Sequence, residues 1–125
     1  MPTIAIIGAS ADRSKFGNKA VRAYMQTGYK VYPVNPREKE IEQLPAYRSI
    51  TDIPLESLDR VSVYLPAGPA LAVIEEIAKK KVGEVWFNPG ADSPAVLERA
   101  RAAGLNVVVG CSIVDLGIYP EELPA

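Results

Sequence analysis

The chain has 125 residues, enough for one domain, and a boundary within it would leave two pieces too small for good cores. Apolar residues make up 48% of it, but the longest apolar runs are about five residues, far short of the roughly 20 that a membrane-spanning helix needs. The net charge of −1 is unevenly spread, because residues 1–39 hold seven basic side chains and two acidic ones. This excess favours a small polyanionic ligand, although chance scatter of surface charge would also produce it. Nucleic acid is disfavoured, since the net charge is modest and the aromatic residues are not interleaved with the basic ones in an RNA-stacking pattern.

The first third of the chain predicts a strand, a helix and a second strand. Residues 3–8 form a buried strand pattern that ends in a glycine, and residues 29–34 form another that stops at Asn35-Pro36. Between them, residues 17–27 predict a helix that Gly28 terminates. The side chains expected on the buried face of this helix are Ala20, Val21, Tyr24 and Met25.

The alternation of strand-like and helix-like segments is weakest over residues 37–60 and becomes regular again after them. The weak segment predicts loop, a short strand around residues 46–50 and a helical turn near residues 54–58. The regular part predicts strands at 61–65, 84–88 and 106–109, a helix at 69–80 and a helix that starts at Pro94 after an N-cap at Ser93. The inward residues expected in the 69–80 helix are Leu71, Ile74, Ile77 and Ala78, while Lys79, Lys80 and Lys81 are expected to be solvated. Residues 111–125 are expected to wrap around the outside.

Strands that alternate with helices predict an α/β fold with a three-layer, doubly wound parallel sheet of the Rossmann-like type. In such folds, ligands bind at the carboxyl ends of the strands. The single domain predicted is therefore residues 1–125, with its functional residues where the strands end.

The first strand-to-helix turn, I-I-G-A-S-A-D-R-S-K-F-G, is typical of a phosphate-binding loop. Gly8 allows a tight turn, and a helix that opens near Gly17 would direct free N–H groups and its positive end at an anion. Ser10 stands where a dinucleotide fingerprint has its second glycine, and its hydroxyl could donate to a phosphate. Arg13 and Lys15 add positive charge. The alternative is a glycine needed only for the turn.

The end of the second predicted strand indicates which nucleotide would bind. NAD-binding proteins place a carboxylate there for the ribose hydroxyl, whereas Val34 leads here into Asn35-Pro36-Arg37-Glu38-Lys39. Arg37 and Lys39 could make charge-assisted contacts to a phosphorylated ribose. This favours the 2′-phosphate of NADP or the 3′-phosphate of coenzyme A over NAD. A plain solvated turn is the alternative.

Five motifs in order, I-A-I-I-G-A-S, G-Y-K-V-Y-P-V-N-P, V-Y-L-P-A, N-P-G-A and G-C-S, resemble the small CoA-binding proteins over roughly residues 3–117. These proteins are similar to the CoA-binding domain of the succinyl-CoA synthetase α subunit. The resemblance implies that the Gly8-Ala9-Ser10 turn holds the CoA diphosphate and that the Asn35-Pro36 turn lines the 3′-phosphate end. It also implies that Pro66-Ala67 flanks the adenine or pantetheine, and that Asn88 to Ala91, with Gly90, lies beside the pantetheine arm. The synthetase's phosphorylated histidine lies in a domain that these residues do not include.

The residue types present argue against catalysis and metal binding by this chain. It has no histidine, no carboxylate pair at the predicted strand ends and no Tyr-x-x-x-Lys pair. Asp92 is expected to help cap the following helix. The single cysteine, Cys111, is expected to pack as a small buried apolar residue rather than to act as a thiol that reacts with CoA. Trp86 and Phe87 are expected to pack in the core.

These observations predict a non-catalytic domain that binds CoA or an acyl-CoA. An NADP-linked oxidoreductase or nucleotide-sensing module is the first alternative, and an interaction protein that has lost its ligand is the second. A single cysteine and the absence of a basic leader predict a cytoplasmic location, away from membranes. A homodimer is plausible on base rates alone.

Overall fold

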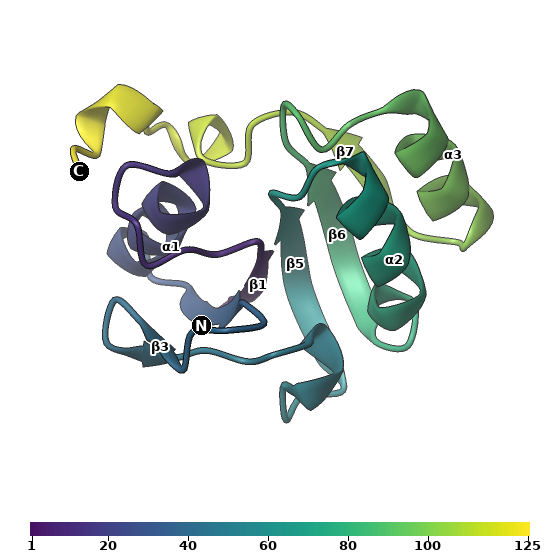
Figure 1. The fold of residues 1–125 in the computed structure, drawn as a ribbon, viewed down its shortest axis with the longest axis horizontal. Coiled ribbons are helices and arrows are strands. Elements are labelled where there is room, and N and C mark those ends of the chain that lie inside the picture. The colour runs from purple at the N-terminus through teal and green to yellow at the C-terminus, as the bar shows by residue number, and fades with distance from the viewer.

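A computed structural model of all 125 residues has one five-stranded parallel sheet (Figure 1). The strand order is β2-β1-β5-β6-β7, and every pairing in this sheet is parallel. The strands are β1 (Thr3–Ile7), β2 (Lys30–Val34), β5 (Ser57–Val63), β6 (Lys81–Phe87) and β7 (Val107–Val109). The helices are α1 (Phe16–Gln26), α2 (Ala67–Ile77) and α3 (Pro94–Ala102). The Rossmann-like α/β prediction is confirmed.

Two apolar clusters, one on each face of the sheet, hold the layers together. On one face, Ile4 and Ile6 of β1 pack against α1 and against Ile113 and Leu123 of the C-terminal segment. On the other face, Val61, Val63 and the adjacent strands pack against α2 and α3 (Figure 1). Alternate residues of one strand thus serve opposite cores, which explains why the buried strands are apolar throughout. Trp86 and Phe87 are buried as predicted.

The segment between β2 and β5 differs from the prediction. Instead of a short strand at 46–50, it forms an antiparallel hairpin of β3 (Glu40–Ile41) and β4 (Leu44–Pro45), followed by a 3₁₀ turn at Ile50–Asp52. The helical turn expected near 54–58 is wrong, because β5 begins at Ser57 and Leu58 lies in the core. Two-residue strands are too short to leave a periodic signal in the sequence.

Several side chains lie elsewhere than expected. Met25 and Leu71 are on exposed helix faces, and Ala78 lies beyond the end of α2 and is also exposed. Lys80 is partly buried, and its ammonium group donates to the carbonyls of Ile53 and Leu55, so this lysine fastens the loop before β5. No helix has the length and apolar character that crossing a bilayer requires.

Candidate functional site

Gly8 and Gly17 bring β1 and the start of α1 unusually close together. Gly8 has φ +88°, and a Cβ placed there would lie 2.3 Å from the carbonyl oxygen of Tyr64. A Cβ at Gly17 would lie 2.1 Å from the carbonyl oxygen of Gly8. Both positions exclude any side chain because the obstructing atoms are backbone. The first loop therefore passes tightly over the carboxyl end of the sheet.

The free amides of this loop lie at the start of α1. The N–H groups of Gly8 and Ala9 both donate to the carbonyl oxygen of Val34 at 3.2 Å, so they are engaged within the protein. The N–H groups of Phe16 and Gly17 have no acceptor in the chain. Lys15 is the N-cap residue of α1, its side chain makes no capping hydrogen bond, and no acidic residue lies in the first turn. An open helix N-terminus of this kind favours an anion.

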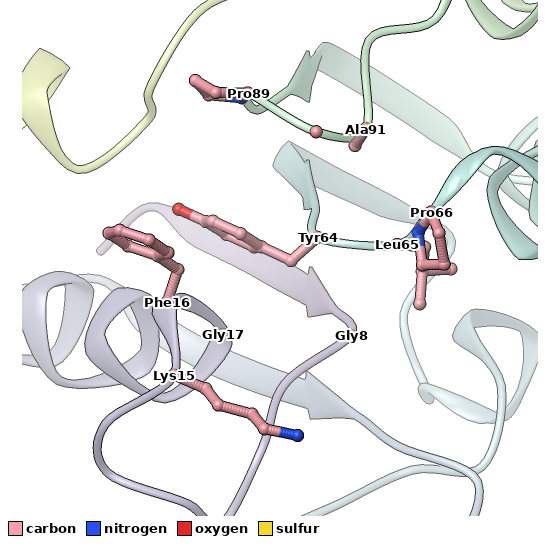
Figure 2. A pocket seen from close by; sticks show the side chains of 10 residues that line it. Gly8, Lys15, Phe16, Gly17, Tyr64, Leu65, Pro66, Pro89 and Ala91 are labelled. Carbon is pink, nitrogen blue, oxygen red and sulfur yellow. The ribbon is translucent and has the colours of Figure 1, made fainter.

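A pocket of about 280 Å³ opens beside this helix end (Figure 2). We call it the loop pocket. In Figure 2 the Phe16 and Tyr64 rings extend from α1 and from the end of β5, while the ammonium end of Lys15 points away from the Phe16 ring. Its lining includes the predicted site residues Gly8, Lys15, Gly17 and Pro66, together with residues 89–91 of the predicted Asn88 to Ala91 segment.

Two more pockets continue from the loop pocket along the same edge of the sheet. The middle pocket, of about 250 Å³, shares Gly8 and Leu65 with the loop pocket and also contains Val34 and Pro36. The basic pocket, of about 260 Å³, shares Pro36 and Arg48 with the middle pocket. Arg37, Lys39 and Arg48 line it, with Glu38 as its acidic member. The three pockets therefore adjoin one another in a row, each sharing lining residues with the next.

Asn35 holds the two predicted turns together. Its Nδ2 donates to the carbonyl oxygen of Ala9 at 2.8 Å, and its Oδ1 accepts from the N–H groups of Arg37 and Glu38. All the hydrogen-bonding atoms of the side chain are thus used to shape the backbone. Asn35 therefore stabilises the backbone around the site, and the neighbouring basic residues Arg37 and Lys39 remain exposed.

Other predicted site residues lie outside the three pockets. Arg13 pairs with Glu42 at 2.7 Å. Asn88 is only 1% exposed, and its amide joins Ser62, the carbonyl of Val63 and the N–H of Ser112 in the interior. Three further residues predicted for the site, Ala9, Ser10 and Ala67, do not line these pockets either.

Local hydrogen bonds also fix two acidic residues and one tyrosine near the site. The hydroxyl and N–H of Ser14 donate to Asp12 and lower the pKa of its carboxyl group. Asp92 accepts from the N–H of Gly90, whereas Ser93 caps α3, so the expectation that Asp92 caps this helix is wrong. Burial raises the pKa of Tyr64, whose hydroxyl lies 3.2 Å from Ser112 Oγ. Tyr64 therefore stays neutral at the wall of the loop pocket.

Sequence reasoning missed several residues that line the pockets. Arg48 joins them because a bridge between Val34 and Tyr47 places it beside the end of β2. Phe16 is 58% exposed at the loop pocket, an unusual position for a large aromatic side chain. The only sequence signals for these two residues are an isolated arginine at position 48 and an aromatic residue directly before Gly17. Cys111, expected to be buried, is partly exposed.

Comparisons with known proteins give the family. A family model described as a CoA binding domain matches residues 2–117. The chain is 30% identical, over 98% of its length, to the acetate–CoA ligase [ADP-forming] I subunit alpha of Pyrococcus furiosus, and 38% identical, over 84%, to the corresponding II subunit alpha. A conserved hypothetical protein from the same organism superposes with a TM-score of 0.82 at 30% identity, covering 92% of this chain and 99% of that one.

The chain spans only part of these ligase subunits. The matched region is 30% of the first subunit and 25% of the second.

Proposed function

Because the chain belongs to the CoA-binding domain family, we propose that it binds CoA or an acyl-CoA across the three adjoining pockets, without itself catalysing a reaction. The loop pocket takes the diphosphate at the start of α1 and the beginning of the pantetheine arm. The middle pocket takes the adenosine. The basic pocket takes the 3′-phosphate.

The observation that carries this proposal is the order of the pockets. CoA has its diphosphate between the pantetheine arm and the adenosine, with the 3′-phosphate on the ribose. Along the sheet edge, the open N-terminus of α1 comes first, a pocket with apolar walls at Val34, Pro36 and Leu65 follows, and a cluster of cations ends the row. Each part of the ligand thus meets surroundings of matching chemistry.

The residue types around the row support binding over catalysis. Tyr64 is the tyrosine of the loop pocket, and burial disfavours its ionised form. Lys15 is an exposed cation at the helix end, suited to a phosphate. A carrier, sensor or presenter of CoA must bind the nucleotide tightly and leave the thioester accessible, and we expect this edge of the sheet to do both.

Calorimetry with CoA, acetyl-CoA, dephospho-CoA and NADP tests the proposal. Wild-type protein should bind CoA and acetyl-CoA more tightly than NADP. Removing Arg37 and Lys39 together, or Arg48 alone, by alanine substitution should weaken CoA binding by about 1–3 kcal/mol, the scale of lost charge-assisted hydrogen bonds. Dephospho-CoA should be nearly unaffected, because it lacks the 3′-phosphate.

A matched control is Lys79→Ala, which removes one exposed positive charge after the end of α2. It should leave binding of all four ligands unchanged. Tighter binding of NADP than of CoA, or equal losses for CoA and dephospho-CoA in the basic-pocket variants, would contradict the proposal.

A further inference from the structure

The turn of the β3–β4 hairpin has backbone angles that its residues do not favour. Glu42 and Gln43 connect the two strands with φ +49° and +67°. Two-residue turns with positive φ at both positions favour Asn and Gly, since other side chains are strained there. Such strain persists where the surrounding structure requires it, and it is frequent at functional sites.

The carboxylate of Glu42 reaches from this turn to the loop formed by residues 8–17. Its Oε1 accepts from the guanidinium of Arg13 at 2.7 Å, and its Oε2 accepts from Asn18 Nδ2 at 3.1 Å. The side chain of Glu42 is only 18% exposed, whereas that of its partner Arg13 is half-exposed. One carboxylate therefore joins the hairpin to both the loop and α1.

Asn18 extends the connection to the backbone of the loop. It is fully buried, and its Nδ2 also donates to the carbonyl oxygen of Ser10 at 2.9 Å. Its Oδ1 accepts from Nε of Arg22, whose NH2 group donates to the carbonyl oxygen of Arg13 at 2.9 Å. The carbonyls of Ser10 and Arg13 are thus held from one side by the same group of side chains.

Electrostatics alone would disfavour a carboxylate beside a site for a diphosphate, since like charges repel. We propose that Glu42 is a positioning residue of the CoA site: through Arg13 and Asn18 it holds residues 8–17 in the binding conformation, and Arg13 is a tether for the loop and makes no phosphate contact. This inference rests on the proposed function. A loop fixed in advance loses less conformational freedom when the ligand binds, which favours affinity.

Two substitutions at neighbouring positions separate the carboxylate from the turn. Glu42→Asn removes the carboxylate but keeps a residue that tolerates positive φ, and Gln43→Gly relieves the turn while keeping the carboxylate. We expect Glu42→Asn to weaken CoA binding about tenfold, at an unchanged melting temperature, because the loop must then be ordered on binding. Gln43→Gly should bind CoA as the wild type does.

The direction of the change decides between the two roles of Arg13. If Arg13 contacted the phosphates and Glu42 merely competed for it, Glu42→Asn would free a positive charge and tighten CoA binding. Tighter or unchanged binding in Glu42→Asn would therefore overturn the inference. Arg13→Ala combined with Glu42→Asn should lose no more affinity than Glu42→Asn alone, since Glu42→Asn already removes the contact that holds Arg13.

Hydrogen exchange without ligand makes the inference testable independently of CoA. The N–H groups of Lys15 and Asn18 donate to the carbonyls of Asp12 and Lys15 inside the tethered region. They should exchange faster in Glu42→Asn than in wild type or in Gln43→Gly. If wild type fails to bind CoA, the proposed function fails alone, whereas equal exchange in Glu42→Asn and wild type overturns the tether.

Discussion

The N-termini of α1 and α3 are built in opposite ways within the same fold. At α3, the hydroxyl of Ser93 accepts from the N–H of Val96, and Pro94 occupies the first turn where no donor is needed. At α1, the cap is Lys15, no side chain caps the helix, and the amides of Phe16 and Gly17 have no acceptor in the chain. An uncapped helix end is less stable than a capped one, so α1 gives up local stability at the place where it faces the loop pocket. Such an end is suited to an anion supplied from outside.

The contrast extends to α2, whose N-cap is Pro66 and which also lacks a side-chain cap. Pro66 lines the loop pocket, whereas Ser93 lines none of the three pockets. The two helices whose N-cap residues line the loop pocket have no side-chain cap, and the helix whose N-cap residue lines none of the three pockets is capped. Capping therefore follows the position of the candidate site.

The largest effect is expected where α1 meets the sheet. Gly17→Ala introduces a Cβ 2.1 Å from the carbonyl oxygen of Gly8, so the helix must move away from the loop. We expect a loss of about 1–3 kcal/mol in the free energy of unfolding, the scale of overpacking, and a large loss of CoA affinity. Urea unfolding and calorimetry measure the two effects.

Gly68→Ala, in the first turn of α2, is the matched control. A Cβ at Gly68 has no heavy atom within 4 Å, so stability should not fall. A Gly17→Ala variant as stable as Gly68→Ala would contradict the close approach of α1 to β1.

A cap introduced on α1 should make it resemble α3. Lys15→Asp supplies a side-chain acceptor for the free amides, and we expect stability to rise by about 0.5–2 kcal/mol. CoA affinity should fall at least tenfold, because the cation is lost and the new carboxylate occupies the amides and repels the diphosphate. Thermal unfolding measures the gain in stability, and calorimetry on the same sample measures the loss of CoA affinity. A capped α1 that still binds CoA like wild type would show that its N-terminus is not the anion site.

The smallest effect is expected from removal of the cap on α3. Ser93→Ala should lower the free energy of unfolding by about 1 kcal/mol, with CoA affinity unchanged. Denaturant unfolding with and without CoA distinguishes the two quantities. A changed CoA affinity would mean that the N-terminus of α3 takes part in the site, which would contradict the contrast drawn between α1 and α3.

The long amphipathic elements and the cap of α3 could be predicted from the sequence, since periodicity and cap residues are local signals. The Gly8 turn and the basic turn after Val34 could be predicted for the same reason. The β3–β4 hairpin could not, because Glu42-Gln43 lacks the usual turn residues and is stabilised by distant partners such as Arg13 and Asn18. Likewise, Arg48 and Lys80 act through contacts that the chain makes only when folded. Asn88 was assigned to the site from its motif, but its side chain is directed into the interior.

The most direct test of the site at the α1 N-terminus is an NMR titration of the protein with CoA that follows individual backbone amides. The account predicts that the amides of Phe16, Gly17 and the Arg37–Lys39 turn shift in a saturable way, while Val96 in α3 does not move. Saturable shifts confined to α3, or binding without any shift at Phe16 and Gly17, would contradict it.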